Sequence, residues 1–250
     1  MCDVTLVFCQ SHCLEGYLLK KEGSKMKILV VGANGKVARH FANQIKEHPL
    51  LQEKAVIRNE EQIPFFRERK IETVLLDIVN NSIEEFAAAM KDVDAVVFSA
   101  GAGGKGLDKT IMIDLDGAIK MMTAAEIAGV KRFVMVSTFK TGRKEITREI
   151  KENSSLTVYT IAKNYADEWL KHRTNLDWTI IHPGSLTNEV GTGKIKLADN
   201  LTGELEKNTI PREDVATVIL ATLENDATIG KEFEVVSGDS SAFEAIKRLN

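Results

Sequence analysis

The stretch "KILVVGANGKVARHF", from Lys27 to Phe41, decides the fold. Its apolar run Ile28–Val31 ends at Gly32, Gly35 follows three residues later, and the apolar residues after it recur at helical spacing. This order predicts a buried strand, a tight turn and a helix. Glycines in such a turn let the backbone approach a diphosphate that rests on the N–H groups of the helix N-terminus.

We therefore interpret Gly32-x-x-Gly35-x-x-Ala38 as a dinucleotide-binding turn, the alternative being a plain strand–helix turn. The expected cofactor contacts in this turn are Gly32, Asn34, Gly35, Lys36 and Val37.

Strand and helix patterns alternate along the rest of the chain. Further strands are expected at 55–57, 73–76, 95–98, 132–136, 178–181 and 232–236, and helices at 36–47, 60–69, 82–90, 109–128, 158–172, 212–223 and 241–248. Ser82 is expected to cap the third helix, Asp108 the fourth, and the segment between 136 and 158 is expected to be a polar connection. Because each helix returns the chain across the sheet, the strands pair in parallel. We predict an α/β fold with a doubly wound parallel sheet (Rossmann fold), one domain over 26–250 and a small C-terminal elaboration.

Composition narrows the class of protein. The formal net charge of the 250 residues is −3, which offers no basic footprint for nucleic acid. No apolar run approaches the roughly 20 residues of a membrane span. The three cysteines lie in the first 25 residues and no partner cluster follows them, so neither a disulfide framework nor a metal site is expected. Residues 1–25 are expected to be a non-essential or disordered extension, or alternatively an accessory strand. The prediction is a cytoplasmic monomer or homodimer that acts on a small molecule.

The ends of the next three strands indicate the type of cofactor. Arg58 directly follows the second strand, where a guanidinium can bind a 2′-phosphate, and this favours NADP over NAD. Glu60 and Glu61 come slightly later and are expected to face solvent. Asp77 and Ile78 follow the third strand, where Asp77 either accepts from the adenine amino group or caps a turn. Ser99, Ala100 and Gly101 follow the fourth and are expected to line the adenosine side of the cleft.

Four later motifs carry a family resemblance: "AGVKRFVMVST" (128–138), "YTIAKNYADEWL" (159–170), "DWTIIHPGSLT" (177–187) and "IPREDVA" (210–216). With the glycine turn, their order and spacing resemble an atypical short-chain dehydrogenase/reductase of the NAD(P)-binding, epimerase/dehydratase-like group. The resemblance extends from Met26 to about Ser237.

The resemblance implies a catalytic site. It assigns Tyr159 to proton transfer, Lys163 to lowering the Tyr159 pKa and binding the nicotinamide ribose, and Ser137 (or its neighbour Thr138) to polarising the substrate oxygen. Pro183 is expected beside the nicotinamide. Asp114 stands where the superfamily often has an asparagine, and ionised aspartate only accepts hydrogen bonds.

The implied activity is NADP-dependent hydride transfer, by an oxidoreductase or an epimerase, on a small carbonyl or sugar-like substrate. Two alternatives remain open: a non-catalytic NAD(P)-binding redox sensor or regulator, and a flavin-type reductase that does not need Tyr159. His182 either reaches the substrate or is structural.

Overall fold

The computed structural model describes residues 25–104, 106–198 and 208–249. A central sheet has the strand order β11-β8-β10-β6-β5-β4-β1-β2-β3. The strands are β1 (Met26–Val31), β2 (Leu51–Ile57), β3 (Glu72–Leu75), β4 (Ala95–Phe98), β5 (Arg132–Val136), β6 (Asp177–Pro183), β8 (Lys194–Ala198), β10 (Lys231–Ser237) and β11 (Ser240–Ser241), while β7 (Ser185–Thr187) pairs with β9 (Thr209–Pro211) apart from it.

The predicted doubly wound parallel sheet is confirmed. The chain begins in the middle of the sheet at β1, adds β2 and β3 on one side, and then crosses to β4, β5, β6 and β10 on the other, all in parallel. The order therefore reverses between β1 and β4, where Ile28 pairs with Ala95. Open α/β sheets bind ligands at such a reversal, beyond the carboxyl ends of the strands. The expectation of purely parallel pairing is wrong at one edge, because β8 runs antiparallel to β10 and to β11.

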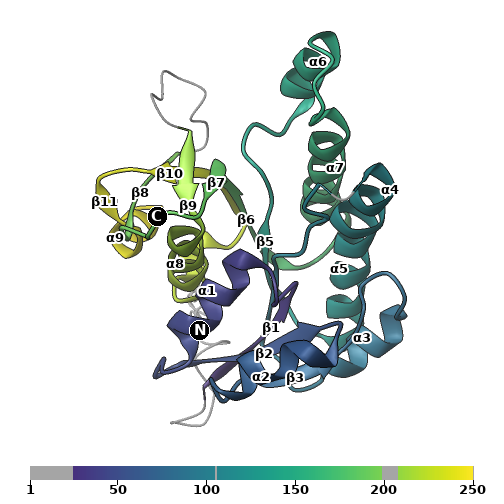
Figure 1. Ribbon diagram of the computed structural model, residues 1–250, viewed down its shortest axis with the longest axis vertical. Coiled ribbons are helices and arrows are strands. Elements are labelled where there is room, and N and C mark those ends of the chain that lie inside the picture. Colours follow the sequence, from purple (N-terminus) through teal and green to yellow (C-terminus); the bar gives the residue numbers. More distant parts are fainter. Residues whose placement is uncertain (1–24, 105, 199–207, 250) are drawn as a thin grey trace, which may run out of the picture.

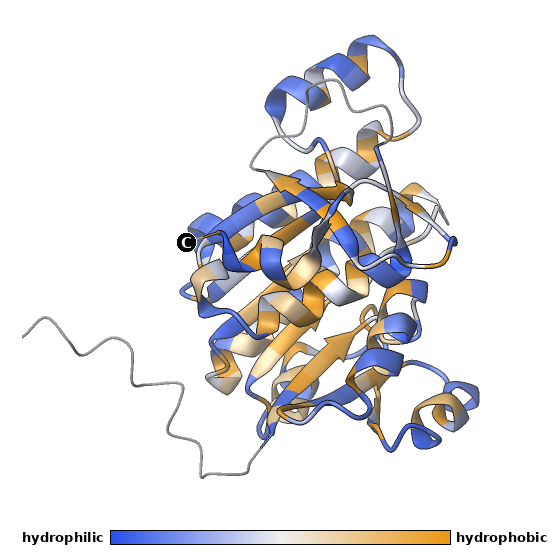
Figure 2. Cartoon of the chain, turned by 90° about the vertical axis from the view of Figure 1, so that its left-hand side faces the viewer, coloured by the Kyte–Doolittle hydropathy of each residue, from blue (hydrophilic) through white to orange (hydrophobic). Residues whose placement is uncertain are grey.

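Two helical layers cover the two faces of the sheet (Figure 1). One apolar layer packs α1 (Lys36–Ile45), α2 (Ile63–Arg67), α8 (Arg212–Leu223) and α9 (Ala242–Lys247) against the sheet. The other packs α3 (Ile83–Ala89), α5 (Gly117–Ala128) and α7 (Thr157–Arg173). Figure 2 shows the strands as a hydrophobic interior between helices whose outer faces are hydrophilic. The apolar strand sequences follow from this burial on both faces.

The helix after β4 differs from the expected single helix at 109–128. It begins at α4 (Leu107–Lys109), continues as the π-helical segment η2 (Thr110–Asp116) and ends as α5, which Gly129 terminates in the left-handed conformation with φ 76°. Asp108 is not its N-cap, because Gly106 precedes the first turn. The predicted capping box of α3 is confirmed, since Ser82 and Glu85 each accept from the other's backbone N–H.

The polar connection after β5 is not a plain loop. Residues Arg143–Lys151 form α6, whose inner face buries Ile146 and whose Arg148 pairs with Glu145 one turn away. The predicted helix over 60–69 is split into the 3-10 turn η1 (Glu60–Gln62) and α2, with Pro64 in the first turn of α2, where its missing N–H costs nothing. A second 3-10 turn, η3 (Asp226–Thr228), follows α8.

Candidate functional site

The glycine turn after β1 brings two strand ends into contact at the point where the strand order reverses. Gly32 has φ +81°, and a β-carbon on it would lie 2.6 Å from the Ala100 Cα in the turn after β4. Gly35 donates its N–H to the Gly32 carbonyl over 2.8 Å and stands as the N-cap of α1. No side chain caps this helix and its first turn carries no acidic residue. The first N–H groups of α1 and its positive end are thus open to an anion, so the turn fits a diphosphate.

The other predicted residues of this turn lie around the helix start. The amide oxygen of Asn34 accepts from the Arg39 guanidinium over 3.0 Å, and that guanidinium stacks 3.8 Å from the centroid of the Phe65 ring. The Lys36 ammonium is exposed and lies 3.5 Å from the Asn188 side-chain oxygen. Val37, in contrast, packs into the apolar layer under the helix, so its side chain faces away from the turn.

The predicted site residues at the ends of β2 and β3 have different surroundings. Arg58 is exposed directly after β2, and its backbone N–H donates to the Gln62 side chain over 3.2 Å. One carboxylate oxygen of Asp77 accepts from the backbone N–H groups of Val79 and Asn80. Asp77 therefore caps a turn, which was one of its two predicted roles. Ile78 packs against Gly117 at the start of α5, where a β-carbon would lie 2.7 Å from its Cδ1.

The turn after β4 is held by Asp114 of η2. The Ala102 N–H donates to Asp114 Oδ2 over 2.9 Å, and a β-carbon on Gly101 would lie 3.0 Å from Asp114 Oδ1. Ser99 and Ala100 are half-buried beside Gly32, and the Ser99 N–H donates to the Val31 carbonyl. Asp114 thus fixes the turn after β4, and this turn touches Gly32. We call the turn Gly32–Gly35, together with the first N–H groups of α1, the glycine cradle.

Asp114 and Lys163 form a buried ion pair. Lys163 Nζ lies 3.9 Å from Asp114 Oδ1 and donates to the Val136 carbonyl over 2.9 Å, and both side chains are almost completely buried. Burial raises the pKa of Asp114, while the Lys163 charge and the Ala102 N–H oppose that rise. Within the described part of the chain, Asp114 Oδ1 has no hydrogen-bond partner. Lys163 is therefore anchored to the end of β5 from the side of α7.

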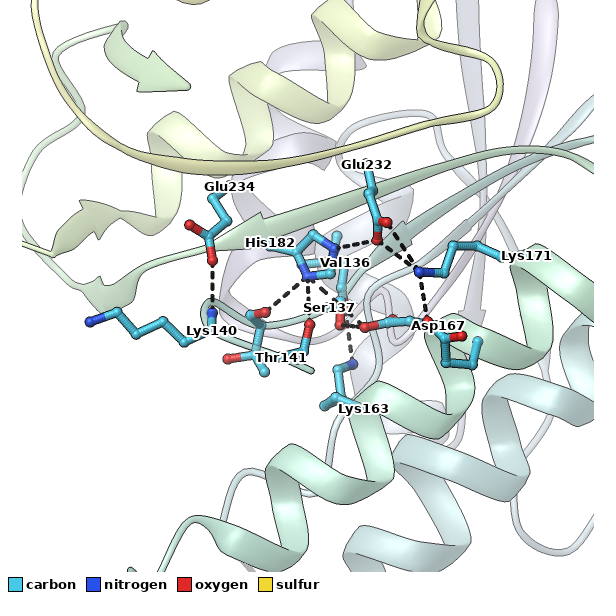
Figure 3. A network of polar contacts seen from close by, with 12 residues as sticks. Val136, Ser137, Lys140, Thr141, Lys163, Asp167, Lys171, His182, Glu232 and Glu234 are labelled. Carbon is cyan, nitrogen blue, oxygen red and sulfur yellow. Dashed lines mark hydrogen bonds and ion pairs between the residues drawn. The ribbon is translucent and has the colours of Figure 1, made fainter. Parts of the chain in front are cut away.

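Ser137, the first residue after β5, is turned toward α7. Its hydroxyl donates to Asp167 Oδ2 over 2.7 Å (Figure 3). Tyr159 is half-buried one helical turn before Lys163, and its hydroxyl makes no hydrogen bond to any other residue that the structure describes. Tyr159, Lys163 and Asp167 follow one another at intervals of four residues, so they share one face of α7. That spacing was the signal for Asp167, which the sequence analysis missed.

The end of β6 completes the site. The Pro183 carbonyl accepts from the Phe139 N–H over 3.0 Å, and the Gly184 N–H donates to the Val235 carbonyl. His182, one residue earlier, is buried and lies 4.0 Å from Asp167. It also contacts Glu232 of β10, which places His182 in a polar network rather than in the turn with Pro183.

The predictions that the protein has no metal site and no membrane span can be compared with the structure only over the residues that it describes. No group of three potential metal ligands occurs among the residues the structure describes, whereas Cys2, Cys9 and Cys13 lie outside them, together with residues 1–24 of the predicted extension. None of the helices at 25–104, 106–198 and 208–249 combines the length and the apolar character needed to cross a bilayer.

Comparison with known proteins gives a consistent picture. Residues 32–226 match the model of the NAD(P)H-binding family. The uncharacterized sugar epimerase YhfK of Bacillus subtilis is 40% identical over 225 residues, which cover 90% of this chain and 100% of the relative. A solved Bacillus halodurans protein named as an NAD-dependent epimerase/dehydratase superposes with a TM-score of 0.80 at 41% identity, over 89% of this chain and 99% of that one. The oxidoreductase ylbE of Lactococcus lactis superposes with a TM-score of 0.75 at 34% identity, over 90% and 96%.

The matched residues 32–226 contain the glycine turn and every predicted site residue, and the match begins directly after β1. The resemblance inferred from the motifs is thereby confirmed, and this chain belongs to the NAD(P)H-binding family of Rossmann-fold proteins.

Proposed function

We propose that this protein is an NADP(H)-dependent oxidoreductase or epimerase that transfers hydride at a site formed by Ser137, Tyr159 and Lys163. The observation that carries the proposal is the anchoring of Lys163 to the Val136 carbonyl, immediately before Ser137. That bond holds the Tyr159–Lys163 face of α7 against the end of β5. The glycine cradle lies at the same carboxyl edge of the sheet, where a dinucleotide binds in this fold.

Each side chain has a distinct task in this proposal. The bound nicotinamide nucleotide supplies the hydride chemistry. The Tyr159 hydroxyl exchanges a proton with the substrate oxygen, and Lys163, one helical turn later on the same face, binds the nicotinamide ribose. Ser137 orients the substrate oxygen by hydrogen bonding. Asp114 balances the Lys163 charge from the other side, a task that an aspartate performs through charge as well as hydrogen bonding.

The proposed preference for NADP depends on Arg58. Its side chain is exposed at the end of β2, the position from which a residue reaches the adenosine ribose in this fold. An arginine there offers charge-assisted hydrogen bonds to a 2′-phosphate. No acidic residue occupies that position, because Glu60 and Glu61 lie in the following turn η1.

The proposed substrate is a small carbonyl or sugar-like compound. Much of the chain after Pro183 completes the sheet through β8, β10 and β11, and α9 packs on that sheet. Little of it is left to build a separate substrate domain. The name of the Bacillus subtilis relative, a sugar epimerase, supports the sugar-like alternative.

A second function, a non-catalytic NAD(P)-binding sensor, is favoured by one observation. The Ser137 hydroxyl already donates to Asp167, so in this arrangement it does not donate to a substrate. A sensor requires the glycine cradle but not Tyr159.

Replacing Tyr159 with phenylalanine decides between these functions. NADPH oxidation is measured with glyceraldehyde, cyclohexanone and menadione as carbonyl probes, and cofactor affinity by calorimetry. If Tyr159 transfers the proton, turnover falls by about 10²–10⁴-fold while NADPH affinity is kept. The matched control is Tyr165→Phe on the same helix, where the tyrosine is 44% exposed. Equal turnover in both variants rejects the tyrosine mechanism.

A further inference from the structure

A network of polar side chains links Ser137 and Asp167 to His182, Glu232 and Lys171 (Figure 3). Ser137 donates to Asp167 over 2.7 Å, and Asp167 Oδ2 lies 4.0 Å from His182 Nδ1. His182 Nε2 lies 3.3 Å from Glu232 Oε2, and Glu232 pairs with Lys171 over 3.0 Å. The network crosses from the end of β5 to α7, β6 and β10, so four elements meet in it.

The contacts of His182 identify its charge. Its Nδ1 lies 2.9 Å from the Thr138 carbonyl, which can only accept. Its Nε2 faces Glu232, whose pKa is lowered to about 2 by the His182 hydrogen bond, against the opposing effect of burial, and further by Lys171, so this carboxylate also only accepts. Both contacts are satisfied when both ring nitrogens carry a proton. Burial lowers the pKa of His182, but Glu232, Asp167 and the Thr138 carbonyl outweigh it and the pKa is raised.

The protonation state of Asp167 depends on the His182 cation. It is completely buried, and its Oδ1 has no hydrogen-bond partner among the described residues. Burial raises its pKa, and Glu232 adds to the rise, whereas the charges of His182 and Lys163 and the Ser137 hydroxyl oppose it. These are the charged and hydrogen-bonding groups that face Asp167 from β10, β6, its own helix and the end of β5. A carboxyl group in such a balance can change its protonation state when one neighbour changes.

The protonation state of Asp167 fixes what Ser137 can do. A serine hydroxyl has one proton to donate. When Asp167 is ionised, that proton goes to Asp167, and only the lone pairs of Ser137 remain. When Asp167 is protonated, its O–H can donate to Ser137 Oγ, and the Ser137 proton becomes available for a substrate carbonyl oxygen.

We propose that Asp167 is a positioning residue that switches Ser137 between accepting and donating a hydrogen bond, and that protonated His182 sets this switch. The inference rests on the proposed function, in which Ser137 contacts the substrate oxygen. It assigns carbonyl binding, and hence reduction, to the form of the protein with Asp167 protonated. In the form with Asp167 ionised, Ser137 accepts a hydrogen bond from a substrate hydroxyl.

Two measurements on the full chain test the switch. The first is the carboxyl-carbon NMR titration of Asp167 in protein with ¹³C-labelled aspartate. Asp167 is expected to take up its proton above the ordinary aspartate range, and higher still in His182→Gln, which removes the cation. His172→Gln, at an exposed histidine on the same helix as Asp167, is expected to leave the titration unchanged. A titration in the ordinary range, or one that His182→Gln does not move, overturns the proposal.

The second measurement is the pH profile of NADPH oxidation with the same three carbonyl probes. Turnover by the wild-type protein is expected to fall as pH rises through the Asp167 ionisation. In Asp167→Asn the amide N–H can donate to Ser137 at every pH, so the fall is expected to disappear while turnover at low pH stays within about threefold of wild type. A merely structural role predicts a loss at all pH values instead, and that result overturns the switch.

The two proposals fail separately. If turnover depends on Tyr159 but the Asp167→Asn profile equals that of the wild type, only the switch is wrong. If Asp167 titrates as expected but Tyr159→Phe has no effect, the link between Asp167 and His182 stands and the tyrosine mechanism is wrong.

Discussion

A β-carbon on Gly32 would lie 2.6 Å from the α-carbon of Ala100, so the turns after β1 and β4 touch through their backbones. No side chain fits between them, and Gly32 also has φ +81°, a conformation that other residues adopt only with strain. The close approach therefore fixes the glycine at the centre of the cofactor cradle.

Gly32→Ala is expected to lower the free energy of unfolding by at least about 2 kcal/mol and to abolish nicotinamide nucleotide binding. The matched control is Gly193→Ala, which has φ +67° but nothing within 4 Å of the new methyl group, so it experiences strain without a clash. Urea denaturation and calorimetry measure the two effects. Equal losses in both variants would show that the contact with Ala100 is unimportant.

Arg58→Ala is expected to weaken NADPH binding by at least about tenfold and to leave NADH binding nearly unchanged, because a charge-assisted bond to the 2′-phosphate contributes about 1.5–3 kcal/mol. Arg173→Ala serves as the control, since Arg173 is an exposed arginine at the far end of α7. Affinities for both nucleotides are compared by calorimetry at one salt concentration. A parallel loss for NADPH and NADH contradicts the assignment.

Lys163→Met is expected to destabilise the protein by about 3–5 kcal/mol, because it leaves the buried Asp114 carboxylate without its cation. Adding Asp114→Asn to the same protein removes that charge and is expected to recover part of the loss. Urea denaturation of the two single variants and the double variant forms a mutant cycle. Strictly additive losses would mean that the two side chains do not interact.

Glu53 predicts a pH dependence of stability. It lies in β2, its carboxylate is buried without a hydrogen-bond partner in the described part of the chain, and burial raises its pKa to about 8. The folded protein thus holds a proton that the unfolded chain releases near pH 4.5, so this contribution to stability is complete below that pH and is lost as pH rises to about 8. The upper limit of the effect is about 5 kcal/mol.

Glu53→Gln keeps the side chain neutral, so its stability advantage over wild type is expected to grow across this pH range. The control is Glu47→Gln at an exposed glutamate after α1. Thermal and urea unfolding at a series of pH values provide the comparison. A constant difference between Glu53→Gln and wild type contradicts a buried, protonated Glu53.

Sequence reasoning succeeded where the pattern is local. The glycine turn, the capping box at Ser82 and the apolar strands each depend on neighbouring residues, and they were predicted in place. Predicting the strands also placed Arg58, Ser99 and Ser137 directly after strand ends, as the structure has them.

It failed where tertiary contacts override the local pattern. The second strand was predicted to begin at Ala55, yet β2 begins at Leu51. It buries the charged residues Glu53 and Lys54, and Lys54 donates to Asp92 and to the Ala89 carbonyl. The antiparallel strand β8 was not predicted, because its pairing with β10 joins residues far apart in the sequence. The helical spacing placed Asp167 on the face of Tyr159 and Lys163, but its contact with Ser137, 30 residues away, appears only in the folded chain.

The π-helical turn of η2 has an evolutionary consequence. A π-helix arises when an α-helix gains one residue without a break in its hydrogen bonding. Removing one residue between Thr110 and Asp116 would close this wide turn into an ordinary α-helical one and change the direction in which Asp114 points from it. Asp114 would then swing away from either Ala102 or Lys163. Length changes in this stretch are therefore tolerated far less than substitutions. Descendants of this chain can change the residue types there, but they must keep the number of residues.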